Sequence, residues 1–123
     1  MRAVVAVIAL IGVCGGGCAL LPDRPAAQVA ALPGALEPVH AAAVARDQAV
    51  FWVSSNGCTA KADLTPIVRH QGDEAVITLR RLREDRCHRP VADGVEVRWT
   101  FQEMGLPSGA RVSINNPYQM PAA

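Results

Sequence analysis

Apolar and polar side chains alternate one by one along residues 94–101, and this pattern constrains the fold more than any other feature of the chain. The apolar members are Val95, Val97, Trp99 and Phe101, and the polar members between them are Glu96, Arg98 and Thr100. Successive side chains of a β-strand point to opposite faces, so this period of two predicts a half-buried strand. A slip of one residue would bury the charges, and the pattern therefore also predicts which face meets the core.

Four other segments have the composition of strands. Residues 49–54 are β-branched and aromatic and end at Ser-Asn-Gly, a turn sequence because Asn and Gly accept positive φ. Residues 64–70 and 74–82 flank a Gln-Gly-Asp turn, and Pro66 makes the first of them an edge strand because proline donates no hydrogen bond. Residues 110–115 predict a last strand, which follows a helical turn at 102–106.

Five short strands with turns about every ten residues predict a small all-β domain. We expect an antiparallel sandwich or an open barrel of one domain, because about 105 residues remain after an N-terminal signal. Phe51 and Trp52 lie next to each other on one strand and so face opposite sides. We expect one of the two to pack inside the domain against Trp99 and Phe101.

The N-terminus has the layout of an export signal. Arg2 precedes an apolar run of about eleven residues at 3–13, and small residues lead to Cys18. The run is too short for a mature membrane helix, which needs roughly 20 residues to cross the hydrocarbon core. We therefore expect residues 1–18 to direct the chain out of the cytoplasm.

The end of this signal resembles a bacterial lipoprotein precursor, in which an aliphatic residue and two small residues precede the lipidated cysteine. Gly16, Gly17 and Cys18 match the small-small-Cys part, although Gly15 stands at the aliphatic position; Cys14, after Ile-Gly-Val, is the alternative site. The resemblance implies a lipid anchor and a place in the cell envelope, with an outer-membrane lipoprotein facing the periplasm as the leading version. A soluble periplasmic or secreted protein, cleaved near Cys18 without lipidation, is the alternative.

Residues 19–46 are rich in alanine and proline and predict an extended tether behind the signal, because proline disfavours long helices and central strands. Within this stretch, residues 39–46 are compatible with one or two helical turns or with more linker. The folded β domain is then expected to occupy residues 47–123.

Cys58 and Cys87 are the cysteines of the predicted domain, and an oxidising compartment favours a disulfide between them. A disulfide that closes a loop of about thirty residues stabilises the folded state by roughly 3.5 kcal/mol in the chain-entropy model. A zinc site with His70 and His88 is the alternative, but Cys87 and His88 are adjacent and no CxxC or HxxxH spacing is present. We expect no metal and no cofactor.

Five arginines fall within ten residues, beginning at the end of the predicted strand 74–82. The cluster consists of Arg80, Arg81, Arg83, Arg86 and Arg89. Guanidinium groups bind carboxylates and phosphates, so the cluster is a candidate site for an acidic protein surface or an anionic glycolipid. Because Glu84 and Asp85 lie within it, a solvated hairpin end is the alternative.

Without Arg2, eleven basic and eleven acidic residues balance each other, which argues against nucleic acid as a partner.

No sequence motif indicates catalysis. The serines at 54, 55, 108 and 113 lack a G-x-S-x-G context, the carboxylates Glu84, Asp85 and Asp93 are expected in loops, and His40 falls in the predicted tether. The segments NGCTAKADL and DRCHRP resemble uncharacterised small secreted bacterial proteins, a resemblance that implies no activity. We expect a non-enzymatic accessory or interaction module of the envelope. The alternatives are an inhibitor of an envelope hydrolase and a small periplasmic enzyme, which a deep polar pocket holding His70 or His88 with a carboxylate would favour.

Overall fold

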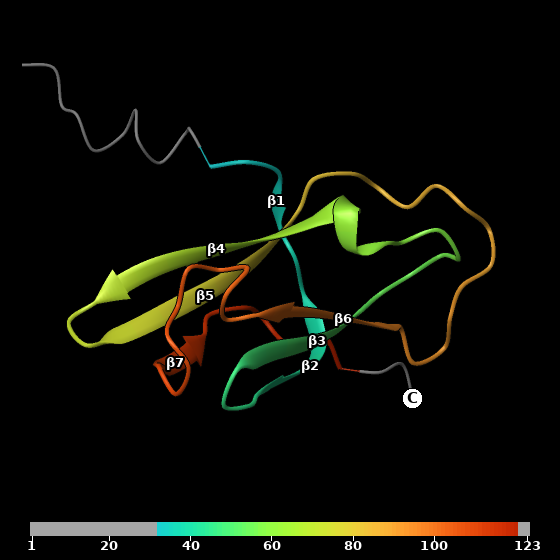
Figure 1. The fold of residues 1–123 in the computed structure, drawn as a ribbon. Helices are drawn as coiled ribbons and strands as arrows, with labels where there is room; N and C mark the ends of the chain where they lie inside the picture. The colour runs from blue at the N-terminus through green and yellow to red at the C-terminus, as the bar shows by residue number, and fades with distance from the viewer. Residues whose placement is uncertain (1–31, 121–123) are drawn as a thin grey trace, which may run out of the picture. The chain divides into compact units, whose positions relative to one another are not determined.

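A computed structural model describes residues 32–120 as two β-sheets (Figure 1). The first sheet contains β1 (Ala35–Leu36), β4 (Leu64–Gln71), β5 (Glu74–Arg81) and β7 (Arg111–Ile114), and the second contains β2 (Val39–Val44), β3 (Gln48–Val53) and β6 (Val95–Thr100). A short 3₁₀ turn, η1 (Lys61–Asp63), precedes β4. All pairs are antiparallel except β5 with β7. The predicted export signal and the tether up to residue 31 lie outside the described residues.

This arrangement confirms the predicted fold class of a small, mostly antiparallel all-β domain. Within residues 32–120 the order β2-β3-β6 and the order β1-β5-β4 form two open sheets, so the sandwich is found and a closed barrel is not. All five predicted strands are present, as β3, β4, β5, β6 and β7. Residues 101–105 form the predicted turn, in which the Leu106 N–H donates to the carbonyl of Phe101 at 2.7 Å.

Strand β6 has the predicted orientation. Val97 and Trp99 are buried, as is Phe101 just after the strand, and Val95 packs half-buried against the core. The alternating polar residues Glu96, Arg98 and Thr100 are exposed. Of the neighbours Phe51 and Trp52, Phe51 is the one that faces the core. It is fully buried, and its ring packs edge-on against that of Trp99 with 5.9 Å between the ring centroids. Trp52 lies half-buried on the opposite face.

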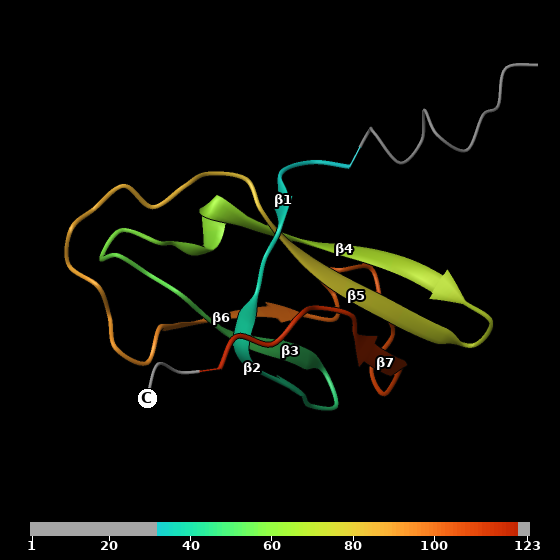
Figure 2. The same ribbon diagram turned by 180° about the vertical axis from the view of Figure 1, so that it is seen from behind.

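The prediction of a tether through residue 46 is wrong for its last part, because β1 and β2 lie within it. Residues 39–46 form neither helical turns nor linker: Val39 is fully buried, and Ala42 packs against the core. Pro33 and Pro38 are compatible with this structure because they lie beside the strands rather than within them. Since β1 pairs with β5 and β2 pairs with β3, this segment passes from one sheet to the other (Figures 1 and 2).

One edge of β5 is covered by three different partners in succession. Strand β7 pairs with the first half of β5 and β1 pairs with its end at Arg80 and Arg81. Between them, the buried side chain of Asn116 takes the place of a strand: it accepts from the Leu79 N–H at 2.8 Å and donates to the Leu79 carbonyl at 2.9 Å and to the Glu37 carbonyl at 2.8 Å. The opposite edge of β5 carries β4, which has no second partner among the described strands, as Pro66 predicts.

Two glycines lie where a side chain does not fit. Gly34 has φ +64°, and a Cβ there would lie 2.1 Å from the carbonyl oxygen of Arg81. Gly94 has φ +72°, and its Cβ would lie 2.3 Å from the carbonyl oxygen of Val53 and 3.1 Å from the ring of His40. Both glycines are therefore required for the close approach of the chain to a neighbouring strand.

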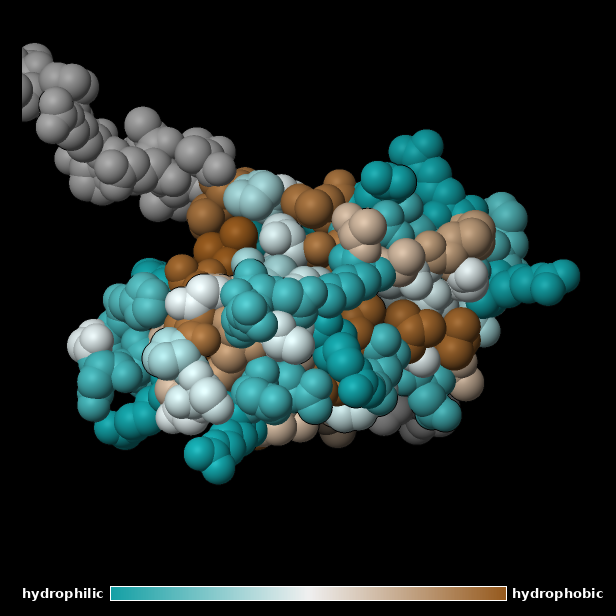
Figure 3. Space-filling view, in the orientation of Figure 1, coloured by the Kyte–Doolittle hydropathy of each residue, from teal (hydrophilic) through white to brown (hydrophobic). Residues whose placement is uncertain are grey.

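Figure 3 shows a largely hydrophilic face with an apolar area over β1. Leu32, which precedes this strand, and Leu36, which lies in it, are both about half exposed. Within residues 32–120 the structure contains no helix with the length and apolar character needed to cross a membrane.

Candidate functional site

A disulfide joins two long loops at one end of the sandwich. Cys58 lies on the loop after β3, Cys87 lies on the loop after β5, and the two are bonded with their Cα atoms 5.8 Å apart. The predicted disulfide is thus confirmed. The loops also pair through their backbones, since the Arg89 N–H donates to the Asn56 carbonyl at 2.8 Å and the Val91 N–H donates to the Ser55 carbonyl at 2.9 Å. We call this pair of loops, residues 54–60 and 82–94, the stapled loops.

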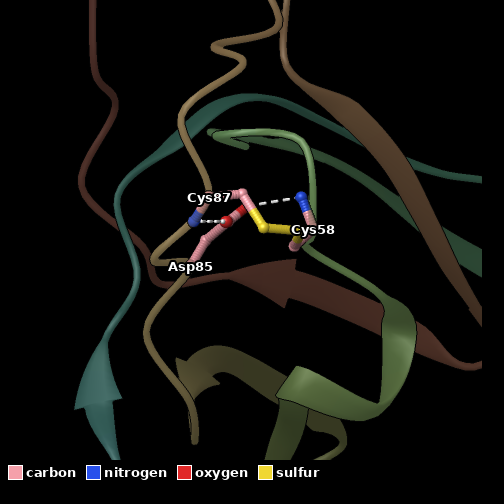
Figure 4. Close-up of side chains that lie close together, drawn as sticks. All are labelled: Cys58, Asp85 and Cys87. Atoms are coloured by element: carbon pink, nitrogen blue, oxygen red, sulfur yellow. Dashed lines mark hydrogen bonds between the residues drawn. A yellow bond between two sulfur atoms is a disulfide. The ribbon is translucent and has the colours of Figure 1, made fainter.

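The carboxylate of Asp85 is the hydrogen-bonding centre of the stapled loops. Figure 4 shows it between the two cysteines, accepting a hydrogen bond from the backbone of each. Its five donors are the N–H groups of Asn56 (2.8 Å), Cys58 (3.0 Å) and Cys87 (3.0 Å) and the hydroxyls of Ser55 (3.1 Å) and Thr59 (2.8 Å). Burial raises the pKa of Asp85, but the hydrogen bonds from Thr59, Cys87, Cys58 and Asn56 lower it further than burial raises it. The net pKa lies well below the usual value, so Asp85 is ionised throughout the physiological range.

Arg81 joins these loops to the strand β1. Its guanidinium donates two parallel hydrogen bonds to the carboxylate of Glu37, both at 2.8 Å. It also donates to the Ser54 carbonyl at 3.0 Å and to the Thr59 hydroxyl at 3.1 Å, which in turn donates to Asp85. The hydrogen bond with Glu37 raises the pKa of Arg81 despite its partial burial. The ion pair therefore belongs to the framework of the site rather than to its free surface.

A polar pocket of about 440 Å³ opens between the stapled loops and the chain around residue 38. Its lining includes the Glu37–Arg81 pair, Asp85 and the more exposed Glu84, together with polar side chains at Ser54, Ser55, Asn56 and Gln119. Most hydrogen-bond donors of this lining already have partners within the protein, as Arg81 and Ser55 illustrate.

Ser54, at the edge of this pocket, lies beside a histidine. The His40 Nε2 and the Ser54 Oγ are 2.9 Å apart, and the Ser54 hydroxyl also lies 3.2 Å from the Gln119 Oε1. The prediction that His40 belongs to a tether is wrong, since it lies half-buried on β2 with its ring close to Gly94. Sequence reasoning missed this pair because the two residues are remote in sequence and belong to no motif.

A second, basic hollow of about 530 Å³ lies over the disulfide. Its lining consists of Gly57, Cys58, Arg86, Cys87, His88 and Arg89. It contains three basic side chains and no acidic one, although Glu84 approaches Arg86 with a separation of 3.7 Å between charged groups.

The predicted arginine cluster divides into two groups. Arg81 turns inward to Glu37, and Arg80 donates to the carbonyls of Pro33 and Gly34, which fastens the start of the described chain to β5. The other three, Arg83, Arg86 and Arg89, lie on the stapled loops and are exposed. Arg83 approaches Asp63 at 3.5 Å with most of its side chain in solvent. A surface formed by all five arginines together is therefore not present, whereas Arg86 and Arg89 line one hollow over the disulfide.

The histidines considered for zinc do not join the two cysteines in a metal site. The group of metal-ligand types found among the described residues is Cys58, Asp85 and Cys87, whose sulfurs are bonded to each other. His88 lies in the basic hollow, and His70 lines a separate shallow hollow at the far end of β4 with Asp73 and Arg111.

The sequence does not predict that Asp85 accepts hydrogen bonds from both loops, because it indicates only an acidic loop residue within the arginine cluster. One local signal was available, because an aspartate commonly accepts a hydrogen bond from the N–H two residues later, here that of Cys87. Its other four donors come from the loop after β3 and have no local sequence signature.

No family model, curated protein or solved structure matches this chain.

Proposed function

We propose that this protein is a non-enzymatic interaction module of the bacterial cell envelope. In this proposal residues 1–18 export the chain, and a lipid on Cys18, or on Cys14 as the alternative, holds it at the outer membrane facing the periplasm. The disulfide supports the proposal, because such bonds persist in oxidising compartments.

The basic hollow is the observation that carries the proposed binding role. It presents Arg86, His88 and Arg89 on loops that the disulfide and Asp85 hold together. A rigid support reduces the entropy lost on binding, because the loops need not become ordered when the partner arrives. Loops on a rigid scaffold are also the usual location of binding residues.

An acidic protein surface is the partner that this chemistry fits best. Guanidinium groups form paired hydrogen bonds with carboxylates, and the exposed positions of Arg86 and Arg89 leave their donors accessible. Arg83 lies on the same loop, with most of its side chain in solvent. An envelope hydrolase with an acidic active-site rim is one such partner, in which case the module acts as an inhibitor.

The test is capture of partners from envelope extract with the tagged, lipid-free chain. The variant Arg83→Ser/Arg86→Ser/Arg89→Ser should lose its bound protein, and wild-type capture should weaken as salt rises from 50 to about 300 mM because exposed charges are screened. The matched control Arg98→Ser removes an exposed arginine from β6, outside the stapled loops, and should capture as the wild type does. Equal capture by the triple variant, or capture of anionic glycolipid alone, would contradict the proposal.

A second candidate, a small hydrolase, is favoured by the His40–Ser54 pair at the polar pocket. A serine within hydrogen-bond distance of a histidine is the arrangement of an activated nucleophile. A fluorophosphonate probe should label Ser54 if this candidate holds, and Ser54→Ala should abolish the labelling. Absence of labelling in the folded wild type would leave the binding role as the better proposal.

A further inference from the structure

The disulfide has a fixed negative charge beside it. An oxygen of the Asp85 carboxylate and the sulfurs of Cys58 and Cys87 all lie within 4.8 Å of one another. Five hydrogen bonds hold the carboxylate in this position, and two of them come from the cysteine backbones themselves (Figure 4). The charge therefore cannot swing away from the sulfurs while the stapled loops remain folded.

Steric cover does not protect this disulfide. Cys58 is exposed, Cys87 is half-buried, and both line the basic hollow of about 530 Å³, which is large enough to admit a small thiol. Thiols attack disulfides as thiolate anions, and the sulfur that leaves also becomes an anion. The electrostatic potential at the two sulfurs therefore affects how fast the bond is reduced.

We propose that Asp85 shields the Cys58–Cys87 disulfide from reduction by repelling thiolates. In the reaction that Asp85 opposes, a thiolate of the reductant attacks the Cys58 sulfur. A bond forms between these two sulfurs, and the bond between Cys58 and Cys87 breaks. Cys87 leaves as a thiolate and takes up a proton from water. A second thiol, on the same reductant or on a second molecule of a monothiol, then displaces Cys58 as a thiolate, so that two thiols are oxidised to a disulfide with the loss of two electrons. Each step places a negative charge on sulfur next to Asp85, and Asp85 makes each step less favourable.

The basic side chains of the hollow act in the opposite direction but from weaker positions. The Arg86 side chain is 88% exposed and lies near Glu84, so water and a carboxylate screen its charge. Arg89 and His88 are also exposed. Asp85 is held within 4.8 Å of both sulfurs, and its interaction with them is screened less than that of side chains that extend into water.

This inference is independent of the proposed partner and is tested by the charge of the attacking thiol. The folded, oxidised protein is treated at low ionic strength with cysteamine, 2-mercaptoethanol or 2-mercaptoethanesulfonate, which are cationic, neutral and anionic. Loss of the disulfide is followed by mass spectrometry. Each rate is divided by the thiolate concentration and by the rate of the same thiolate with a small neutral disulfide, because nucleophilicity varies with thiol pKa. We expect the cationic thiol to react fastest and the anionic one slowest, over a range of about tenfold that narrows at high salt.

The variant Asp85→Asn keeps an acceptor for the backbone N–H groups but removes the charge. Its three rates should converge to within about threefold, with the anionic thiol gaining most. Asp93→Asn, a neutralised carboxylate elsewhere on the same loop, should keep the wild-type range. Loosening of the loops would accelerate all three thiols alike, so it is distinguished from loss of the charge.

The wild-type series alone can overturn the inference if Asp85→Asn does not fold. Equal rates for the three thiols would show that Asp85 does not set the potential at the sulfurs, and a faster reaction with the anionic thiol would show that the arginines of the hollow set it. Arg86→Gln/Arg89→Gln provides a further check, because removing these charges should widen the wild-type range.

Discussion

Arg81 and Glu37 form a two-pronged ion pair whose side chains are 15% and 6% exposed. Arg81 ends β5, and Glu37 lies between β1 and β2, so the pair fastens the segment that passes from one sheet to the other. The guanidinium also reaches the Ser54 carbonyl and the Thr59 hydroxyl. The same residue thereby connects the β1–β2 segment with the stapled loops.

Breaking this pair should be strongly destabilising. Glu37→Gln leaves a largely buried guanidinium without its paired carboxylate, and we expect a loss of about 3 kcal/mol in urea unfolding. Glu84→Gln, which removes a carboxylate from the exposed pair with Arg86, should change stability by less than about 1 kcal/mol. Similar losses for both variants would contradict the structural role of Glu37.

The two faces of β6 should differ sharply. Trp99 is 7% exposed and packs on Phe51, so Trp99→Ala should cost about 3–5 kcal/mol. Arg98→Ala removes an exposed side chain that pairs with Glu96 and should stay within about 0.5 kcal/mol. Comparable shifts of the two denaturation midpoints would mean that the strand is wrongly oriented.

The disulfide should account for a large part of the domain's stability. Titration of denatured, unreduced protein purified from the envelope should find neither Cys58 nor Cys87 as a free thiol. The double variant Cys58→Ser/Cys87→Ser should lose roughly 3 kcal/mol, because the unfolded chain regains the freedom of a closed loop. Two reactive thiols at these positions would contradict the bond.

The lowered pKa of Asp85 makes stability depend on pH in the acid range. The ionised carboxylate is favoured in the folded state, so its contribution is complete above the unfolded pKa of about 3.9 and is lost as the pH falls below that value. Chemical unfolding of the wild type should therefore become easier between about pH 5 and pH 2. Asp85→Asn should be less stable at pH 7 and should lose less stability on acidification, and parallel pH profiles would contradict this assignment.

Lipidation is predicted at a position before the described residues. Cys18→Ser should abolish incorporation of labelled palmitate and leave the precursor uncleaved, because the modified cysteine is also the site at which the signal is removed. Loss of labelling in Cys14→Ser but not in Cys18→Ser would move the site to Cys14. If the wild type takes up no label, the lipoprotein interpretation fails.

Local patterns predicted most of the sheets correctly. Alternation along β6 requires one face to be buried, Pro66 excludes β4 from a central position, and the turn at Gly72 joins β4 to β5. Strands β1 and β2 escaped prediction because alanine and proline carry little strand signal. Their place depends on partners remote in sequence, such as Arg81 for β1 and Phe51 for β2.

In the candidate site, too, some features could be predicted from the sequence and others depended on the tertiary structure. The pairing of Cys58 with Cys87 follows from the sequence, because these are the cysteines of the predicted domain and the predicted export to an oxidising compartment favours a disulfide. The five donors around Asp85, the inward turn of Arg81 and the contact of His40 with Ser54 were decided by tertiary structure. Side-chain period and turn chemistry act over a few neighbouring residues and can be read along the chain. A hydrogen bond between loops exists only after the two sheets have packed, since packing sets which polar groups leave water together and must satisfy one another.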